Sequence, residues 1–237
     1  MAQRSLYDLL NGEFASGNPA LAEDAANPDA VVARQRFVYN FAGKNNIQSN
    51  AWDITESNSG DATITNDGLR LATGTTNASY CQIDFDDKRP FDRDGCSVIW
   101  SFKGGIPSNA TANTGWIQLG IGNANGNSGA IFFVTAGVHS GSTAHQFALR
   151  TMRSESFSTV DTSMANDNLW HTTKVHNASD GDAIGGAATL WIDGILRATC
   201  STNLQSEADM QPIGYLGYGN DGVNKTVDIN YCEAYNT

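Results

Sequence analysis

The side chains best able to do chemistry in this sequence are its carboxylates. Two carboxyl groups about 5–5.5 Å apart can hydrolyse a glycosidic bond with retention, and alternate positions on one β-strand supply that spacing. Asp84 and Asp86 alternate in this way. Asp87 and Lys88 follow directly, as at the end of a strand, so we interpret the pair as part of a solvated acidic rim.

The histidines and cysteines give no recognisable catalytic or metal-binding pattern. The four histidines lack the H-E-x-x-H spacing, and there is no G-x-S-x-G elbow and no P-loop. His171, beside Trp170 on a predicted strand, is expected to be a surface or packing residue. The four cysteines lack the close pairs of a zinc site, and we favour buried free thiols over disulfides: Cys81, Cys96, Cys200 and Cys232.

Oxygen-rich clusters raise the question of calcium. None of them matches an EF-hand loop: Asp84–Asp87, Asp92–Asp94, Asp180–Asp182 and Asn220–Gly222. We therefore expect no cofactor, with calcium as the alternative.

Sugar binding would need aromatic rings beside polar groups on exposed loops. Trp116 borders the polar loop 104–114, and Tyr215 or Tyr218 lies close to Asn220 and Asp221. The candidate glycan-facing residues are therefore Trp116, Tyr218, Asn220 and Asp221. Of the other tryptophans, Trp100 and Trp191 are expected in the core, whereas the sequence does not decide between core and surface for Trp52 and Trp170.

From Arg36 onward, apolar residues recur at every second position, which is typical of half-buried strands. About a dozen such strands are separated by turn residues, and no convincing helix interrupts them. Each of the following sets is expected to line one face of a strand: Phe37, Tyr39 and Phe41; Cys81, Ile83 and Phe85; Val98, Trp100 and Phe102; Val227, Ile229, Tyr231 and Tyr235. The pattern predicts an all-β, two-sheet antiparallel jelly-roll sandwich.

The last third of the chain holds the most specific motif. Four strand-like runs follow one another, and Asp193-Gly194 forms a hairpin turn after the second: Leu169–Val175, Ala188–Gly194, Ile213–Gly217 and Val227–Tyr231. The motif resembles the closing strands of the concanavalin A-like lectin/glucanase superfamily, which includes laminin G-like domains. The resemblance implies a lectin-like sandwich over residues 36–237. Glucanases of that superfamily carry a Glu-x-Asp-x-Glu pattern that is missing here, so we expect no enzyme.

Residues 1–35 differ from the rest and are expected to form an N-terminal arm and linker. Ser5 to Gly12 could form one or two helical turns, followed by a tether rich in Ala, Asn, Asp and Pro. The arm's apolar patch could pack on its own sandwich or dock on a neighbouring subunit: Leu6, Tyr7, Leu9 and Leu10. We expect the arm to be dispensable for folding and required for assembly.

Charge and composition narrow the function further. The 237 residues carry a formal net charge of −11, which disfavours nucleic acid and anionic membranes as partners. The start shows no signal peptide, so use without Sec export is expected.

A leaderless, lectin-like sandwich with a docking arm and no catalytic pattern suggests a virion structural protein, of the kind that decorates a tailed-phage capsid. This expectation rests on analogy at the level of fold. The expected partners are virion proteins such as the major capsid protein and further copies of the chain, assembled in the host cytoplasm. The alternative is a glycan-binding module that reads cell-surface glycans, and a divergent glycosidase comes third.

Overall fold

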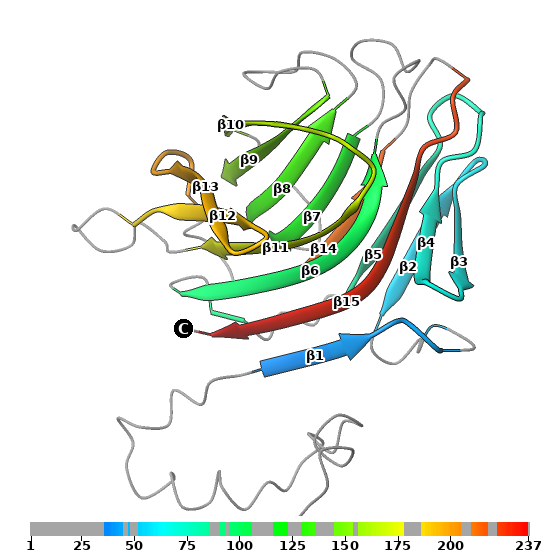
Figure 1. Cartoon of the computed structure of the whole chain (residues 1–237), viewed down its shortest axis with the longest axis horizontal. Helices are drawn as coiled ribbons and strands as arrows, with labels where there is room; N and C mark the ends of the chain where they lie inside the picture. The colour runs from blue at the N-terminus through cyan, green and yellow to red at the C-terminus, as the bar shows by residue number, and fades with distance from the viewer. Residues whose placement is uncertain are drawn as a thin grey trace, which may run out of the picture.

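The computed structural model describes residues 36–44, 47, 52–85, 91–92, 95–105, 116–122, 129–135, 145–153, 156–177, 186–204, 210–217 and 222–236. These residues form two antiparallel sheets and no helix, which confirms the predicted all-β sandwich (Figure 1). Accordingly, no helix capable of crossing a membrane is found among them.

Sheet A contains both ends of the described chain. Its strand order is β13 (Ile195–Cys200), β12 (Ala188–Ile192), β11 (Trp170–Asn177), β6 (Cys96–Gly105), β15 (Thr226–Asn236), β4 (Gly68–Ala72) and β3 (Asp61–Thr65). The first strand, β1 (Arg36–Asn40), also pairs with β15, and Phe37 lies opposite Ala234. The first and last strands of the described chain therefore lie side by side.

Sheet B lies against sheet A and has seven strands. Their order is β10 (Ser156–Ala165), β9 (Gln146–Arg153), β8 (Gly129–Thr135), β7 (Trp116–Gly122), β14 (Gln211–Leu216), β5 (Tyr80–Asp84) and β2 (Asp53–Ser57). Neighbours such as β14 and β5 come from distant parts of the sequence, so any site on this sheet combines separate segments.

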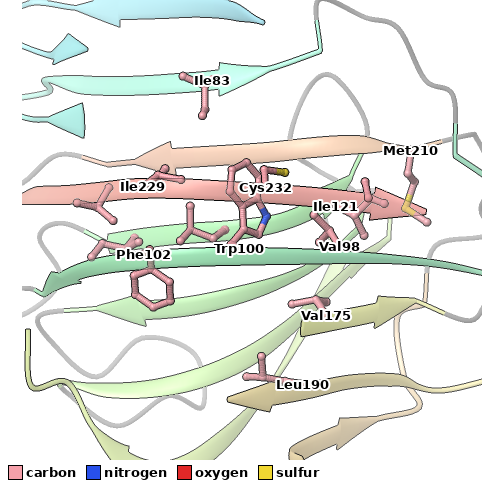
Figure 2. Close-up of a cluster of buried hydrophobic side chains, with 14 of the residues drawn as sticks. Ile83, Val98, Trp100, Phe102, Ile121, Val175, Leu190, Met210, Ile229 and Cys232 are labelled. Atoms are coloured by element: carbon pink, nitrogen blue, oxygen red, sulfur yellow. The ribbon is translucent and has the colours of Figure 1, made fainter. Parts of the chain in front are cut away.

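Alternation builds the core between the two sheets. Trp100 of β6 is fully buried, and its indole N–H donates to the Gly120 carbonyl of β7, at 3.3 Å across the two sheets. Figure 2 shows Trp100 among side chains of both sheets, including Ile83 and Ile121 of sheet B and Val98 of sheet A. The alternating sets of β5 and β6 are buried as predicted, and Ile117, Leu119 and Ile121 of β7 are buried in the same way.

Aromatic rings from both sheets meet in the core next to β1. Trp52, just before β2, contacts Phe41, Phe85 and Trp100 with centroid separations of 5.3, 5.0 and 5.9 Å. These contacts connect Phe41, just after β1 of sheet A, to Trp52, just before β2 of sheet B.

Two predicted orientations are wrong. The pairing of β15 with β6 shifts at Asn230, where a β-bulge adds one residue and reverses the alternation. Val227 and Ile229 therefore face the core, whereas Tyr231 is half-exposed and Cys232 takes the buried position. Trp191 is the second case, because it alternates with buried Leu190 and Ile192 and lies half-exposed outside the core.

The predicted hairpin between β12 and β13 is confirmed. Asp193 and Gly194 both have positive φ, at 53° and 77°, and Ile192 pairs with Ile195 across the turn. The Asp193 side chain also accepts from the Thr172 N–H at 2.9 Å, which ties the turn to β11.

Substituting Gly194→Val should lower the free energy of unfolding by more than about 1 kcal/mol, since a β-branched residue resists positive φ. A Cβ at this position meets nothing within 4 Å, so the cost is conformational rather than steric. Chemical denaturation measures it, with Thr199→Val, at an exposed position in β13, as the control. Equal stability of the two variants would contradict the assignment of the turn.

Candidate functional site

The site residues predicted from the sequence fall largely outside the described residues. This applies to the arm residues Leu6, Tyr7, Leu9 and Leu10 and to Tyr218, Asn220 and Asp221. Trp116 begins β7, but only its backbone is described. Their grouping stays a prediction, and the site must be built from described positions.

A row of polar and aromatic side chains crosses the outer face of sheet B. Strand pairing places Thr55 opposite Gln82, Gln82 opposite Tyr215, and Tyr215 opposite Gln118. Directly opposed residues share one face of an antiparallel sheet. The neighbours Cys81, Ile83, Ile117, Leu119 and Leu216 are buried in the core, so the row faces away from it.

Two tyrosines form the aromatic part of this face. The rings of Tyr80 and Tyr215 are 5.6 Å apart and nearly parallel, with an interplanar angle of 25°. Both are half-exposed. Stacked, half-exposed rings beside amides offer both an apolar platform and hydrogen-bonding groups.

Close strand packing positions Tyr215. Its neighbour Gly214 faces inward, where a Cβ would come within 2.9 Å of the Ile83 side chain. Glycine at this position therefore allows β14 to lie close to β5. A larger residue there would push Tyr215 away from Tyr80.

Carboxylates border the row at the β2–β5 edge. Asp84 lies opposite Asp53, and the Gln82 Nε2 donates to Asp84 Oδ2 at 2.7 Å. Asp84 is only 7% exposed, so the prediction that it belongs to a solvated rim is wrong for this residue. We call the set Asp53, Thr55, Tyr80, Gln82, Asp84, Gln118 and Tyr215 the polar face.

The polar face carries no positive charge. The strands β2, β5, β14 and β7 contain no Lys, Arg or His. In the described strands of sheet B the cationic residues are confined to β9, where Arg150 is 5% exposed and 4.7 Å from the Phe157 ring. Burial lowers the pKa of Arg150 to about 10.

His171 is a buried residue with two side-chain hydrogen bonds, and the sequence did not reveal these bonds. Its Nδ1 lies 2.7 Å from Asp193 Oδ2 and its Nε2 lies 2.9 Å from Asp167 Oδ1. Burial of the ring opposes protonation, but the two hydrogen bonds outweigh it and raise the pKa of His171. The ring packs against Phe147 at 5.4 Å. Of the two predicted alternatives, His171 is therefore a packing residue, and its two hydrogen bonds also clamp the start of β11 to the hairpin turn.

The described residues contain no group of three or more His, Cys, Asp or Glu able to hold a metal ion. Of the carboxylate and amide side chains in the calcium candidates, only those of Asp84 and Asp92 lie among them. The cysteines are all buried and free, as the favoured interpretation predicted. Burial, followed by Glu56 and Asp61, raises the pKa of the Cys81 thiol to about 12, so this thiol is a poor nucleophile.

Gln82, Gln118 and Thr55 are the residues that sequence reasoning missed. Gln82 and Gln118 alternate with buried positions and Thr55 follows half-buried Ile54, which was the available signal, but strand order alone decides that they meet. Alternation shows which side chains of a strand face outward, but it does not show which strand lies next to it in the sheet.

No family model matches the sequence, and no curated protein matches it significantly. Similar solved structures exist. The carbohydrate recognition domain of Emp46p, metal-free form, superposes with a TM-score of 0.58 at 8% identity, over 83% of this chain and 94% of that one. A potassium-bound form of that domain is similar as well.

Two further structures show the range of proteins with this architecture. An endo-β-1,4-glucuronan lyase from the fungus Trichoderma reesei has a TM-score of 0.55 at 14% identity, over 85% of this chain and 95% of that one. A botulinum neurotoxin type C structure, whose cell entry depends on two ganglioside molecules, has a TM-score of 0.56 at 11% identity, over 84% and 47%. The chain therefore has the concanavalin A-like sandwich that its C-terminal motif indicated.

The His171 clamp should make stability depend on pH. The pKa of His171 is raised in the folded state, so its contribution is complete below about pH 6.5 and declines as the pH rises through the folded-state pKa. The free energy of unfolding of wild type minus that of His171→Gln, measured by denaturation between about pH 5 and 9, should fall with rising pH.

His176→Gln provides the control with the opposite sign. Burial and then Lys174 lower the pKa of His176, so its contribution is lost on acidification instead. A wild-type minus His171→Gln difference that stays constant over this range would contradict the clamp.

Proposed function

We propose that this chain is a glycan-binding module and that its ligand lies on the polar face of sheet B. The observation that carries the proposal is the row Thr55–Gln82–Tyr215–Gln118, with Tyr80 stacked on Tyr215. Pyranose rings present apolar C–H faces that pack on aromatic rings, while their hydroxyls need the amide and carboxylate partners found here. Similar folds in a carbohydrate recognition domain and in a ganglioside-dependent toxin support the proposal.

The charge of the face favours a neutral, hydroxyl-rich glycan. Asp53 and Asp84 lie side by side on β2 and β5, and no basic residue occurs in the four strands of the polar face. Carboxylates accept hydrogen bonds from sugar hydroxyls but repel uronates and sulfates.

Replacing Tyr215→Ala should weaken glycan binding by at least about tenfold, or roughly 1.4 kcal/mol. The full chain is first tested on a glycan array, and the best ligand is then titrated calorimetrically against wild type and variant. Tyr235→Ala, a half-exposed tyrosine on sheet A, is the matched control and should bind normally. A blank array, or full affinity of Tyr215→Ala at an unchanged melting temperature, would refute the proposal.

We further expect no catalysis on the polar face, although one similar structure is a lyase. The paired glutamates of the glucanases are absent, and the described strands of the face offer no His or Lys as a base. β-Glucans, xylans, agars and glucuronan should therefore yield neither new reducing ends nor unsaturated products. Turnover that persists through purification and is lost in Asp84→Asn would show that the face is an active site.

A virion-decorating role is the finer function predicted from the sequence, and it stays a prediction. It is compatible with a glycan-binding module, because an appendage can read a host surface. Co-purification of the chain with a particle would test it.

A further inference from the structure

The outer face of sheet A carries a second row of side chains, on the opposite side of the sandwich from the polar face. Strand pairing places six residues side by side across six strands: Leu196, Trp191, Lys174, Ile99, Glu233 and Val38. Leu196 is 52% exposed and the other five are half-exposed. We call this set the sheet A row.

Aromatic rings make the row broad and apolar. Lys174 Nζ lies 5.2 Å from the Trp191 ring and 5.7 Å from the Tyr235 ring, so its ammonium group links the two rings. Trp170, also on β11, is 39% exposed. Exposed aromatic and aliphatic side chains gathered in this way mark an interaction surface.

The charged residues of this face include two lysines that stand outside its ion pairs. Its carboxylates in β15 are both paired, Glu233 with Arg36 at 2.8 Å and Asp228 with Arg70 at 2.7 Å. Lys103 and Lys174 have no carboxylate partner among the described residues. A protein of net charge −11 therefore presents here two lysines that form no salt bridge with a described carboxylate.

The segment 1–35 has the complementary chemistry. Its acidic residues outnumber its basic ones by five to two, a net charge of −3: Asp8, Glu13, Glu23, Asp24 and Asp29 against Arg4 and Arg34. Its apolar patch is Leu6, Tyr7, Leu9 and Leu10. It enters sheet A at Arg36, which pairs with Tyr235 beside the row.

The geometry allows the patch to reach the row. From β1 to β12 the face spans four strand spacings, or about 19 Å. The 25 residues between Leu10 and Arg36 would span roughly 25–30 Å as a flexible chain. A tether whose ordinary length matches the span gives a high effective concentration.

We propose that the N-terminal segment docks on the sheet A row of its own chain. The apolar patch covers Trp191, Leu196 and Ile99, and the acidic tether lies along Lys103 and Lys174. This surface is independent of the glycan proposal, because it lies on the other sheet.

Paramagnetic broadening in the full chain tests the docking. A nitroxide is attached to Asn11→Cys in 15N-labelled protein; the four native thiols are buried. Amide signals of Thr189–Leu196 should broaden, and those of Tyr80–Asp84 on sheet B should not. Broadening should weaken at high salt, because exposed charge pairs are screened.

Variants separate docking from general effects. Leu6→Asp/Leu9→Asp/Leu10→Asp should abolish the broadening, whereas the charge-matched Ala20→Asp/Ala22→Asp/Ala25→Asp should retain it. On the face, Trp191→Ser should abolish it and Tyr80→Ser should not.

Three outcomes would overturn the proposal. The first is an absence of broadening on β12 and β13 in the wild-type arm. The second is broadening that survives the leucine variant. The third is broadening in a mixture of two kinds of chain, one 15N-labelled without a nitroxide and the other 14N with the nitroxide. Only docking of the arm on a second copy of the chain would produce it.

Discussion

The contact on which the rest of the molecule depends is that of Trp100 with the opposite sheet. Its indole N–H donates to the Gly120 carbonyl, so the largest side chain of β6 is fixed against β7. A fully buried indole without this partner would leave a costly unsatisfied donor. Once the two strands are fixed, alternation decides which side chains of every neighbouring strand face outward, including Tyr215 and Trp191.

Much of the fold follows from alternation that can be read in the sequence. The core positions of β5, β6 and β7 and the Asp193-Gly194 turn were all predictable, because period two and turn chemistry are local properties. The bulge at Asn230 was not, because it depends on how β15 pairs with β6. Trp191 was misplaced for a related reason, since a tryptophan looks like a core residue until its face is known.

The candidate sites could be predicted far less well. The polar face joins β2, β5, β14 and β7, and no local pattern in the sequence reveals that Gln82 meets Tyr215. The His171 clamp likewise joins Asp167 and Asp193, which only the folding of the hairpin back onto β11 brings together. Similar folds do not fill this gap, because the same sandwich serves a carbohydrate recognition domain and a lyase.

The two outer faces differ in chemistry because each sheet has to bury only one side. Sheet B turns tyrosines, amides and two carboxylates outward, whereas sheet A turns tryptophans outward together with two lysines that form no salt bridge with a described carboxylate. Sheets in a sandwich pack about 10 Å apart, so a ligand on one face cannot touch a segment on the other. The residue types on one outer face therefore do not restrict those on the other. The two faces are linked only through the shared core, in which Trp100 contacts both sheets. The concanavalin A-like sandwich can therefore carry a recognition surface on one sheet and a docking surface for a segment of its own chain on the other.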